Sequence, residues 1–119
     1  MTATTVEELQ NKRCRPCEGG VDACSRDEAD RQLEQLAGWS LAPDGNSIRK
    51  SWRMKDFAAG IRLLNGIAEI AEQEGHHPDL HLEGYRNVRV ELTTHAIGGL
   101  SENDFIMAAK IGRLQEGDT

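Results

Sequence analysis

The residues of this chain best suited to chemistry near neutral pH are its histidines. His76 and His77 stand side by side just after Gly75, where a helical pattern ends, and His95 lies further along the chain. Imidazole has an unperturbed pKa close to physiological pH, so two such rings can donate and accept protons within one turnover. These residue types therefore point to acid–base catalysis on a loop, the kind of segment that most often carries function.

Two carboxylates lie at spacings that let them support these rings. Glu72 precedes His76 by four residues, close enough for contact if the last helical turn persists that far. Asp104 occupies the third position of a final helix that Ser101 can cap. An acid at that position completes a capping box without any catalytic duty, so both a structural and a catalytic role stay open for Asp104.

Three helices are expected to position these groups. The first follows the capping box of Ser25 and Glu28 and ends near Gly38. The second is capped by Asp56 and runs to Glu74, after which Gly75 and Pro78 stop it. Apolar residues recur along it at helical spacing, namely Phe57, Ile61, Leu64, Ala68 and Ala71, widened by Leu63, Ile67 and Ile70. The third helix follows Ser101 and is expected to bury Met107, Ala108, Ile111 and Leu114.

Four strands complete the expected domain. Residues 39–41 and 48–52 flank the turn formers of 43–46 and predict a hairpin, with Trp39 and Trp52 interpreted as core residues. Residues 80–85 and 88–95 alternate by two around a tight turn, which puts His81, Tyr85 and His95 on the polar face. The resulting order is α-β-β-α-β-β-α, an α+β domain with a four-stranded antiparallel sheet and three helices packed on one face.

Composition limits the classes of protein that fit. A length of 119 residues suits a single domain, and a net charge of −6 argues against binding nucleic acid or anionic lipid through the overall field. Neither a membrane-spanning stretch nor a signal-peptide core is visible, which predicts a cytoplasmic protein. Residues 1–24 are expected to be a flexible extension of the domain formed by 25–119. Cys14, Cys17 and Cys24 are interpreted as free thiols, because a second pair of zinc ligands is missing.

The spacing of these residues resembles the signature of the pterin-4a-carbinolamine dehydratases. In that signature an acidic residue is followed by His-His-Pro, an aromatic residue, a third His and an Asp. The slots are filled here by Glu72, His76, His77, Pro78, Tyr85, His95 and Asp104. The similarity extends over most of the chain after about Asp22, and the N-terminal extension resembles that of bacterial members.

This resemblance implies a hydro-lyase that converts 4a-hydroxytetrahydropterin to quinonoid dihydropterin, a step of pterin recycling. It implies that His76 and His95 transfer protons, that His77 positions the pterin ring and that Pro78 fixes the turn. Glu72 and Asp104 would orient the imidazoles, and Tyr85 would support the substrate. A homodimer or homotetramer is implied, with a small pterin as the partner molecule and no metal or redox cofactor.

Three alternatives belong to other classes of protein. The chain could be a dehydratase-like binding protein, such as a Rubisco assembly factor or a dimerisation cofactor of transcription factors. His76, His77, His95 and Asp104 could instead hold a metal ion, although adjacent histidines usually point in different directions. The cluster could also be a satisfied polar network in an interaction domain.

Overall fold

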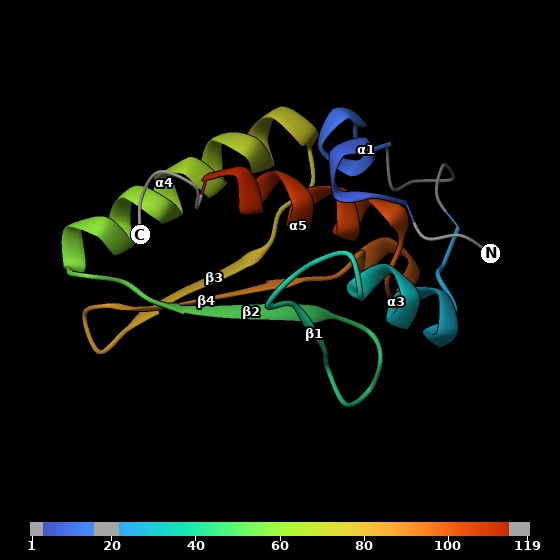
Figure 1. Ribbon diagram of the computed structural model, residues 1–119, viewed down its shortest axis with the longest axis horizontal. Coiled ribbons are helices and arrows are strands. Elements are labelled where there is room, and N and C mark those ends of the chain that lie inside the picture. The colour runs from blue at the N-terminus through green and yellow to red at the C-terminus, as the bar shows by residue number, and fades with distance from the viewer. Residues whose placement is uncertain (1–3, 16–21, 115–119) are drawn as a thin grey trace.

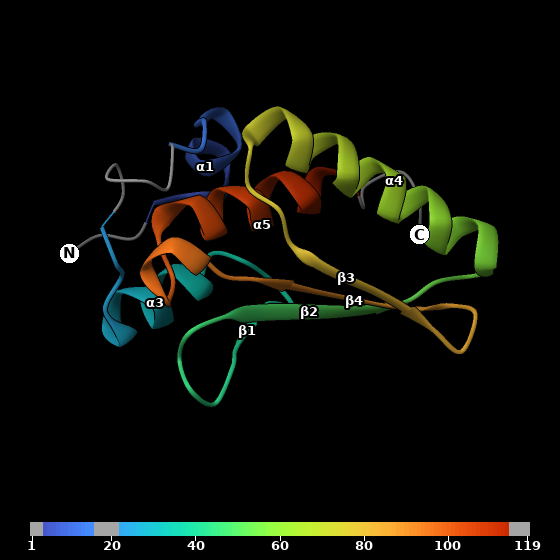
Figure 2. The ribbon, with the colours of Figure 1, turned by 180° about the vertical axis from the view of Figure 1, so that it is seen from behind.

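The computed structural model describes residues 4–15 and 22–114. The sheet is antiparallel and has the strand order β1-β2-β4-β3. Its strands are β1 (Ser40–Leu41), β2 (Ile48–Arg53), β3 (Asp79–Glu83) and β4 (Asn87–Leu92), and the α-helices are α1 (Val6–Asn11), α3 (Arg26–Leu33), α4 (Phe57–Glu74) and α5 (Glu102–Leu114). Figure 1 shows α1, α4 and α5 above the sheet, and Figure 2 shows the same layers from behind. The predicted α+β class and four-stranded antiparallel sheet are confirmed.

The local signals predict where α3 starts and where α4 starts and ends, but α3 ends at Leu33, before the stop predicted near Gly38. Ser25 and Glu28 form both hydrogen bonds of the capping box that starts α3. The Asp56 carboxylate accepts from the backbone N–H of Ala59 at 2.8 Å and starts α4. Gly75 ends α4 with φ +66°, a left-handed conformation that glycine adopts without a Cβ penalty. The chain therefore leaves α4 at the histidine pair, as the sequence predicted.

One face of the sheet is apolar and lies under the helices. In β4 the side chains of Val88, Val90 and Leu92 are buried, while the residues between them are more exposed. Trp39 is buried and packs edge to face against Trp52, with ring centroids 6.1 Å apart. The interpretation of both tryptophans as part of the packed interior fits this contact.

The buried stripe of α4 differs from the predicted one. Phe57 and Ile61 are exposed, whereas the buried residues are Ala59, Gly60, Leu63, Ile67 and Ala71. Gly60 explains the rotation of the helix, because a Cβ built there would lie 3.1 Å from Leu82 of β3. The missing side chain lets the helix approach the sheet on that side, and this close approach was not visible in the spacing of large apolar residues.

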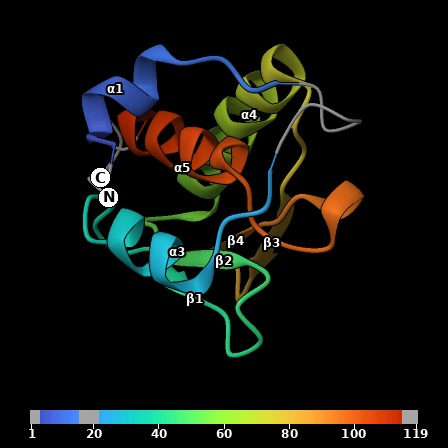
Figure 3. The same ribbon diagram turned by 90° about the vertical axis from the view of Figure 1, so that its right-hand side faces the viewer.

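The N-terminal segment also differs from the expectation of a flexible extension. Residues 4–15 include α1, which starts with a capping box between Thr5 and Glu8 and buries Leu9 completely. Figure 3 shows α5 lying between α1 and α4. Because α1 covers a side of α5 that would otherwise face solvent, α5 is buried on most of its circumference, from Asn103 to Ala109 and at Ile111. Cys17 and the predicted joint at 18–20 lie outside the described residues.

The last predicted strand, residues 88–95, extends further than the observed strand. β4 stops at Leu92, and His95 begins a short 3-10 helix, η1 (His95–Ile97). The chain turns back because Gly98 adopts φ +65° and Thr94 pairs with Gly99 across the loop. His95 is therefore presented by a closed loop instead of a strand end.

The positive φ of Gly75 predicts the effect of adding one methyl group. Gly75→Ala should destabilise the protein by about 1 kcal/mol, because an L-residue is strained in that conformation even though nothing lies within 4 Å of the new Cβ. Gly112→Ala is the matched control, since it also has open space but lies inside α5. It should stabilise the protein by roughly 0.5–1 kcal/mol. Urea unfolding of both variants measures the difference, and equal effects would contradict the argument.

Candidate active site

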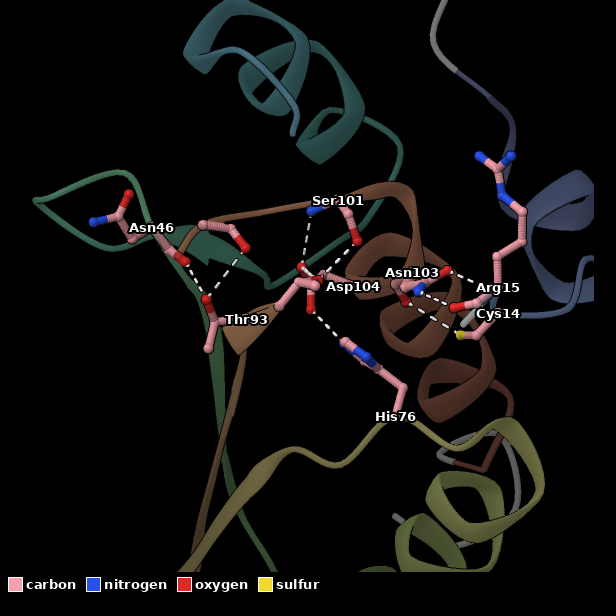
Figure 4. Close-up of polar contacts among 10 residues, drawn as sticks. Cys14, Arg15, Asn46, His76, Thr93, Ser101, Asn103 and Asp104 are labelled. Atoms are coloured by element: carbon pink, nitrogen blue, oxygen red, sulfur yellow. Dashed lines mark hydrogen bonds and ion pairs between the residues drawn. The ribbon is translucent and has the colours of Figure 1, made fainter. Parts of the chain in front are cut away.

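Asp104 is the centre of a buried group of polar side chains. Its Oδ1 lies 2.7 Å from Nε2 of His76, while its Oδ2 accepts from the Thr94 hydroxyl at 2.8 Å and from the Ser101 backbone N–H at 3.0 Å. Figure 4 shows His76 reaching from the end of α4 toward Asp104 at the start of α5. Asp104 is fully buried and His76 is 5% exposed. A buried carboxylate with three partners is well satisfied and holds its neighbours in place.

Asp104 contacts both the start of α5 and an imidazole in the structure. Its bond to the Ser101 N–H is one half of a capping box and supports the first turn of α5. Ser101 itself does not use its hydroxyl in the predicted way, because that hydroxyl pairs with Thr94 Oγ1 at 2.7 Å. The other oxygen of Asp104 remains for His76. The carboxylate therefore links the helix start to the imidazole.

This contact determines which nitrogen of His76 carries hydrogen. A carboxylate accepts hydrogen bonds, so an Nε2 that lies 2.7 Å from Asp104 Oδ1 donates to it. In a neutral ring the basic lone pair is then on Nδ1. An acid that fixes the tautomer and orientation of a histidine in this way is a recurring part of proton-transfer sites.

Glu72 supports His77, not His76 as the spacing had suggested. The Glu72 Oε2 lies 2.6 Å from His77 Nε2, and the two side chains are 77% and 64% exposed. The chain turns away from the helix at Gly75, which moves His76 inward and leaves His77 beside the outer face of the last turn. The loop thus carries two imidazoles, one in a buried pair with Asp104 of α5 and one in an exposed pair with Glu72 of α4, and half-buried Pro78 leads into β3.

The remaining predicted residues are less closely associated with the pair. His95 is exposed, and its neighbour Thr94 holds Asp104. Tyr85 is 60% exposed on the β3–β4 turn, which adjoins the start of β4, whereas Thr94 follows its end. A strand of that length separates them by about 20 Å, so one chain does not bring Tyr85 to Asp104. His81 lies opposite Arg89 in the β3–β4 ladder, away from the buried pair.

Several residues that support the site were missed in the sequence. Thr94 is the one with a readable signal, because it continues the alternation of the buried positions Val88, Val90 and Leu92 yet is polar. The Glu74 side chain is 3% exposed and accepts from the Cys14 backbone N–H at 2.8 Å, with Arg13 and Lys110 as ion-pair partners. No local pattern marked this contact, because its partners lie about 60 and 36 residues away.

The two described cysteines are free and partly buried. Burial and the adjacent Glu74 carboxylate raise the pKa of the Cys14 thiol to about 12. Burial also raises the pKa of the Cys24 thiol to about 11. Thiols with such pKa values are poor nucleophiles at neutral pH, so neither cysteine is a candidate for catalysis. In the described ranges, no three His, Cys, Asp or Glu residues are grouped so that they could hold a metal ion.

Asp104 is buried and Glu72 is exposed, so neutralising each acid should change the free energy of unfolding by different amounts. Asp104→Asn should destabilise the protein by roughly 3 kcal/mol, because it breaks a buried pair and misplaces an amide donor. Glu72→Gln makes the same chemical change in the exposed pair and should cost at most about 1 kcal/mol. Equilibrium urea unfolding compares them, and equal losses would argue against the buried Asp104 network.

Glu74 predicts how stability depends on pH. Burial by itself would raise the pKa of its carboxyl, but the Cys14 N–H, Lys110 and Arg13 outweigh burial and lower the pKa below the usual 4.5. A carboxyl with a lower pKa in the folded state stabilises the fold above its unfolded pKa. This contribution is lost as pH falls through the folded pKa. Below about pH 4.5 the free energy of unfolding should therefore fall more steeply in the wild type than in Glu74→Gln. Parallel pH curves would contradict the assignment.

Comparison with known proteins places this chain in a family. The family model described as pterin 4 alpha carbinolamine dehydratase matches residues 22–114. The chain is 48% identical to the mitochondrial pterin-4-alpha-carbinolamine dehydratase 2 of Arabidopsis thaliana, covering 98% of this chain and 64% of that protein. A relative from Nitrosospira multiformis, named for the same dehydratase, is 46% identical over 93% of this chain and 96% of its own length.

Solved structures agree with the fold. A transcriptional coactivator/pterin dehydratase from Brucella melitensis superposes with a TM-score of 0.74 at 30% identity, over 78% of this chain and 98% of that one. A pterin dehydratase-like protein identified as a RuBisCO assembly factor in the alpha-carboxysome superposes with a TM-score of 0.55 at 22% identity, over 69% of this chain and 93% of that one. The second likeness concerns the fold alone. From the family match and the relatives that share most of its length, this chain belongs to the pterin 4 alpha carbinolamine dehydratase family.

Proposed function

We propose that this protein dehydrates 4a-hydroxytetrahydropterin to quinonoid dihydropterin by histidine acid–base catalysis. The observation that carries the proposal is the buried hydrogen bond between His76 and Asp104. His77, the next residue on the loop, forms an exposed pair with Glu72. Family membership supplies the class of substrate, and the two pairs supply groups that can hold and move protons near neutral pH.

The reaction needs one proton delivered and one removed. An acid protonates the hydroxyl at the 4a carbon so that it leaves as water, and a base takes a proton from a ring nitrogen. The sum is the loss of one water molecule. General acid–base catalysis by positioned imidazoles accounts for both transfers. We assign them to His76 and His95, in the roles that the family signature implies.

In the structure each of the two acids, Asp104 and Glu72, contacts one imidazole, which favours an orienting role for both. Asp104 orients His76 with Nε2 as donor, which leaves Nδ1 as the basic atom of the neutral ring. Glu72 holds His77, whose exposure lets it meet the face of a bound pterin. Pro78 fixes the backbone after the pair. Tyr85 is left out of this assignment within one chain, because it lies beyond the far end of β4.

The exposed apolar residues of α4 suggest how the protein assembles. Phe57 and Ile61 lie one turn apart on α4 and are both exposed, at 54% and 38%. Exposed apolar residues on one helix face support a homodimer or homotetramer.

No helix in the described part of the chain is long and apolar enough to cross a membrane. We propose a cytoplasmic setting, while the Arabidopsis relative is named as mitochondrial.

A stopped-flow experiment tests the function. 4a-Hydroxytetrahydropterin is generated in the instrument, and its disappearance is followed with and without protein. We expect clear acceleration by the wild type and a loss of on the order of a hundredfold or more in kcat for His76→Ala and for His95→Ala. His81→Ala is the control, since His81 lies on the sheet opposite Arg89, and its rate should stay unchanged.

Two outcomes would change the proposal. No acceleration by the folded wild-type protein would favour the non-catalytic binding role. Full activity of the His76 and His95 variants, with loss in His81→Ala, would move the site to the open face of the sheet.

A further inference from the structure

The segment from Lys12 to Arg15 crosses the molecule next to the His76–Asp104 pair, and we call it the strap. It contacts the end of α4 through Glu74. The Cys14 N–H donates to Glu74 Oε1 at 2.8 Å, and the Arg13 Nε lies 3.1 Å from Glu74 Oε2. Lys110 of α5 reaches the same oxygen at 3.0 Å. The strap thus shares one buried carboxylate with both α4 and α5.

The strap also contacts the start of α5 through Asn103. The Arg15 N–H donates to Asn103 Oδ1 at 3.0 Å, and Asn103 Nδ2 donates back to the Arg15 carbonyl at 2.8 Å. The Cys14 thiol approaches the Asn103 carbonyl at 3.6 Å. These contacts are drawn beside the His76–Asp104 pair in Figure 4. A paired donor and acceptor fix both the distance and the direction of the Asn103 side chain.

Glu74 and Asn103, two residues that the strap contacts, lie next to the members of the pair in the chain. Glu74 precedes His76 by two residues, and Asn103 precedes Asp104 by one. The two members of the pair are separated by 28 residues, so their spacing depends on how α4 and α5 dock. The strap is hydrogen-bonded to α4 two residues before His76 and to α5 one residue before Asp104, so it links the two helices next to the pair.

We propose that the strap sets the spacing of the His76–Asp104 pair, and that Glu74 and Asn103 are positioning residues for it. The catalytic consequence rests on the proposed dehydratase function, but the geometric claim does not. A proton-transfer pair loses much of its rate when its geometry is displaced by about 1 Å, even if every reacting group is present. The part of the chain expected from sequence to be a loose extension would then act on the site.

The experiment compares Asn103→Ala and Glu74→Gln with the wild type. Asn103→Ala removes the two-point contact with Arg15, and Glu74→Gln keeps the shape but weakens the contact with Arg13 and Lys110. Arg113→Ala is the matched control, because Arg113 also joins α5 to the N-terminal segment, through Gln10, but far along the helix. All variants are measured as full-length chains at a temperature where circular dichroism shows them folded.

Two readouts separate positioning from simple stability. The first is the NMR resonance of the His76 Nε2 proton, which reports the bond to Asp104 without any assay of activity. We expect it to shift or broaden in both variants and to stay in place in Arg113→Ala. The second is kinetics, in which kcat should fall roughly tenfold or more while KM changes less than twofold.

Each outcome is decisive. An unchanged His76 resonance in both folded variants would overturn the proposal, and so would an equal shift in Arg113→Ala. A shifted resonance with reduced kcat supports it. If the resonance shifts but the wild type shows no dehydration, the strap still positions the pair, and it is the proposed function that fails.

Discussion

The structure of this site depends on one buried carboxylate. Asp104 receives hydrogen bonds from three separate parts of the chain: the loop after α4, the end of β4 and the residues just before α5. An unpaired charge at a fully buried position would cost several kcal/mol, so these partners must all be present when the domain is folded. The requirement couples helix docking to the geometry of His76. Stability and the arrangement of the candidate site therefore share the same contacts.

The two imidazole–carboxylate pairs show how one reversal of the chain creates different environments for adjacent residues. His76 and His77 are consecutive, yet the first is buried and the second is mostly exposed. The left-handed Gly75 turns the backbone so that successive side chains point to opposite sides. This divergence gives one ring a fixed tautomer in a dry setting and leaves the other accessible. Such a difference suits a site in which one histidine is held and another meets a substrate.

The N-terminal segment adds a layer that the domain boundaries expected from sequence did not include. α1 buries Leu9 against α5, and the strap that follows ties both α4 and α5 through Glu74 and Asn103. The apolar content of α5 is consistent with this cover, because a helix buried on most sides needs neighbours on most sides. The segment therefore belongs to the packed structure at least as far as Arg15.

Local chemistry made much of this protein predictable from its sequence. The Ser25–Glu28 capping box, the Asp56 cap, the Gly75 stop and the turn formers at 43–46 depend on neighbouring residues only, so three helices, four strands and their order could be predicted, whereas α1 was missed. The spacing of the histidines and Asp104 likewise identified the family resemblance. The direction in which the chain leaves Gly75 could not be predicted, so the contact of Glu72 with His77, five residues away, was missed. Contacts between more distant segments were also beyond this reasoning: that Thr94 completes the Asp104 network and that Tyr85 lies away from it. Those facts depend on how helices dock on the sheet, and docking is decided by close approaches such as that of Gly60 to Leu82, which no local pattern encodes.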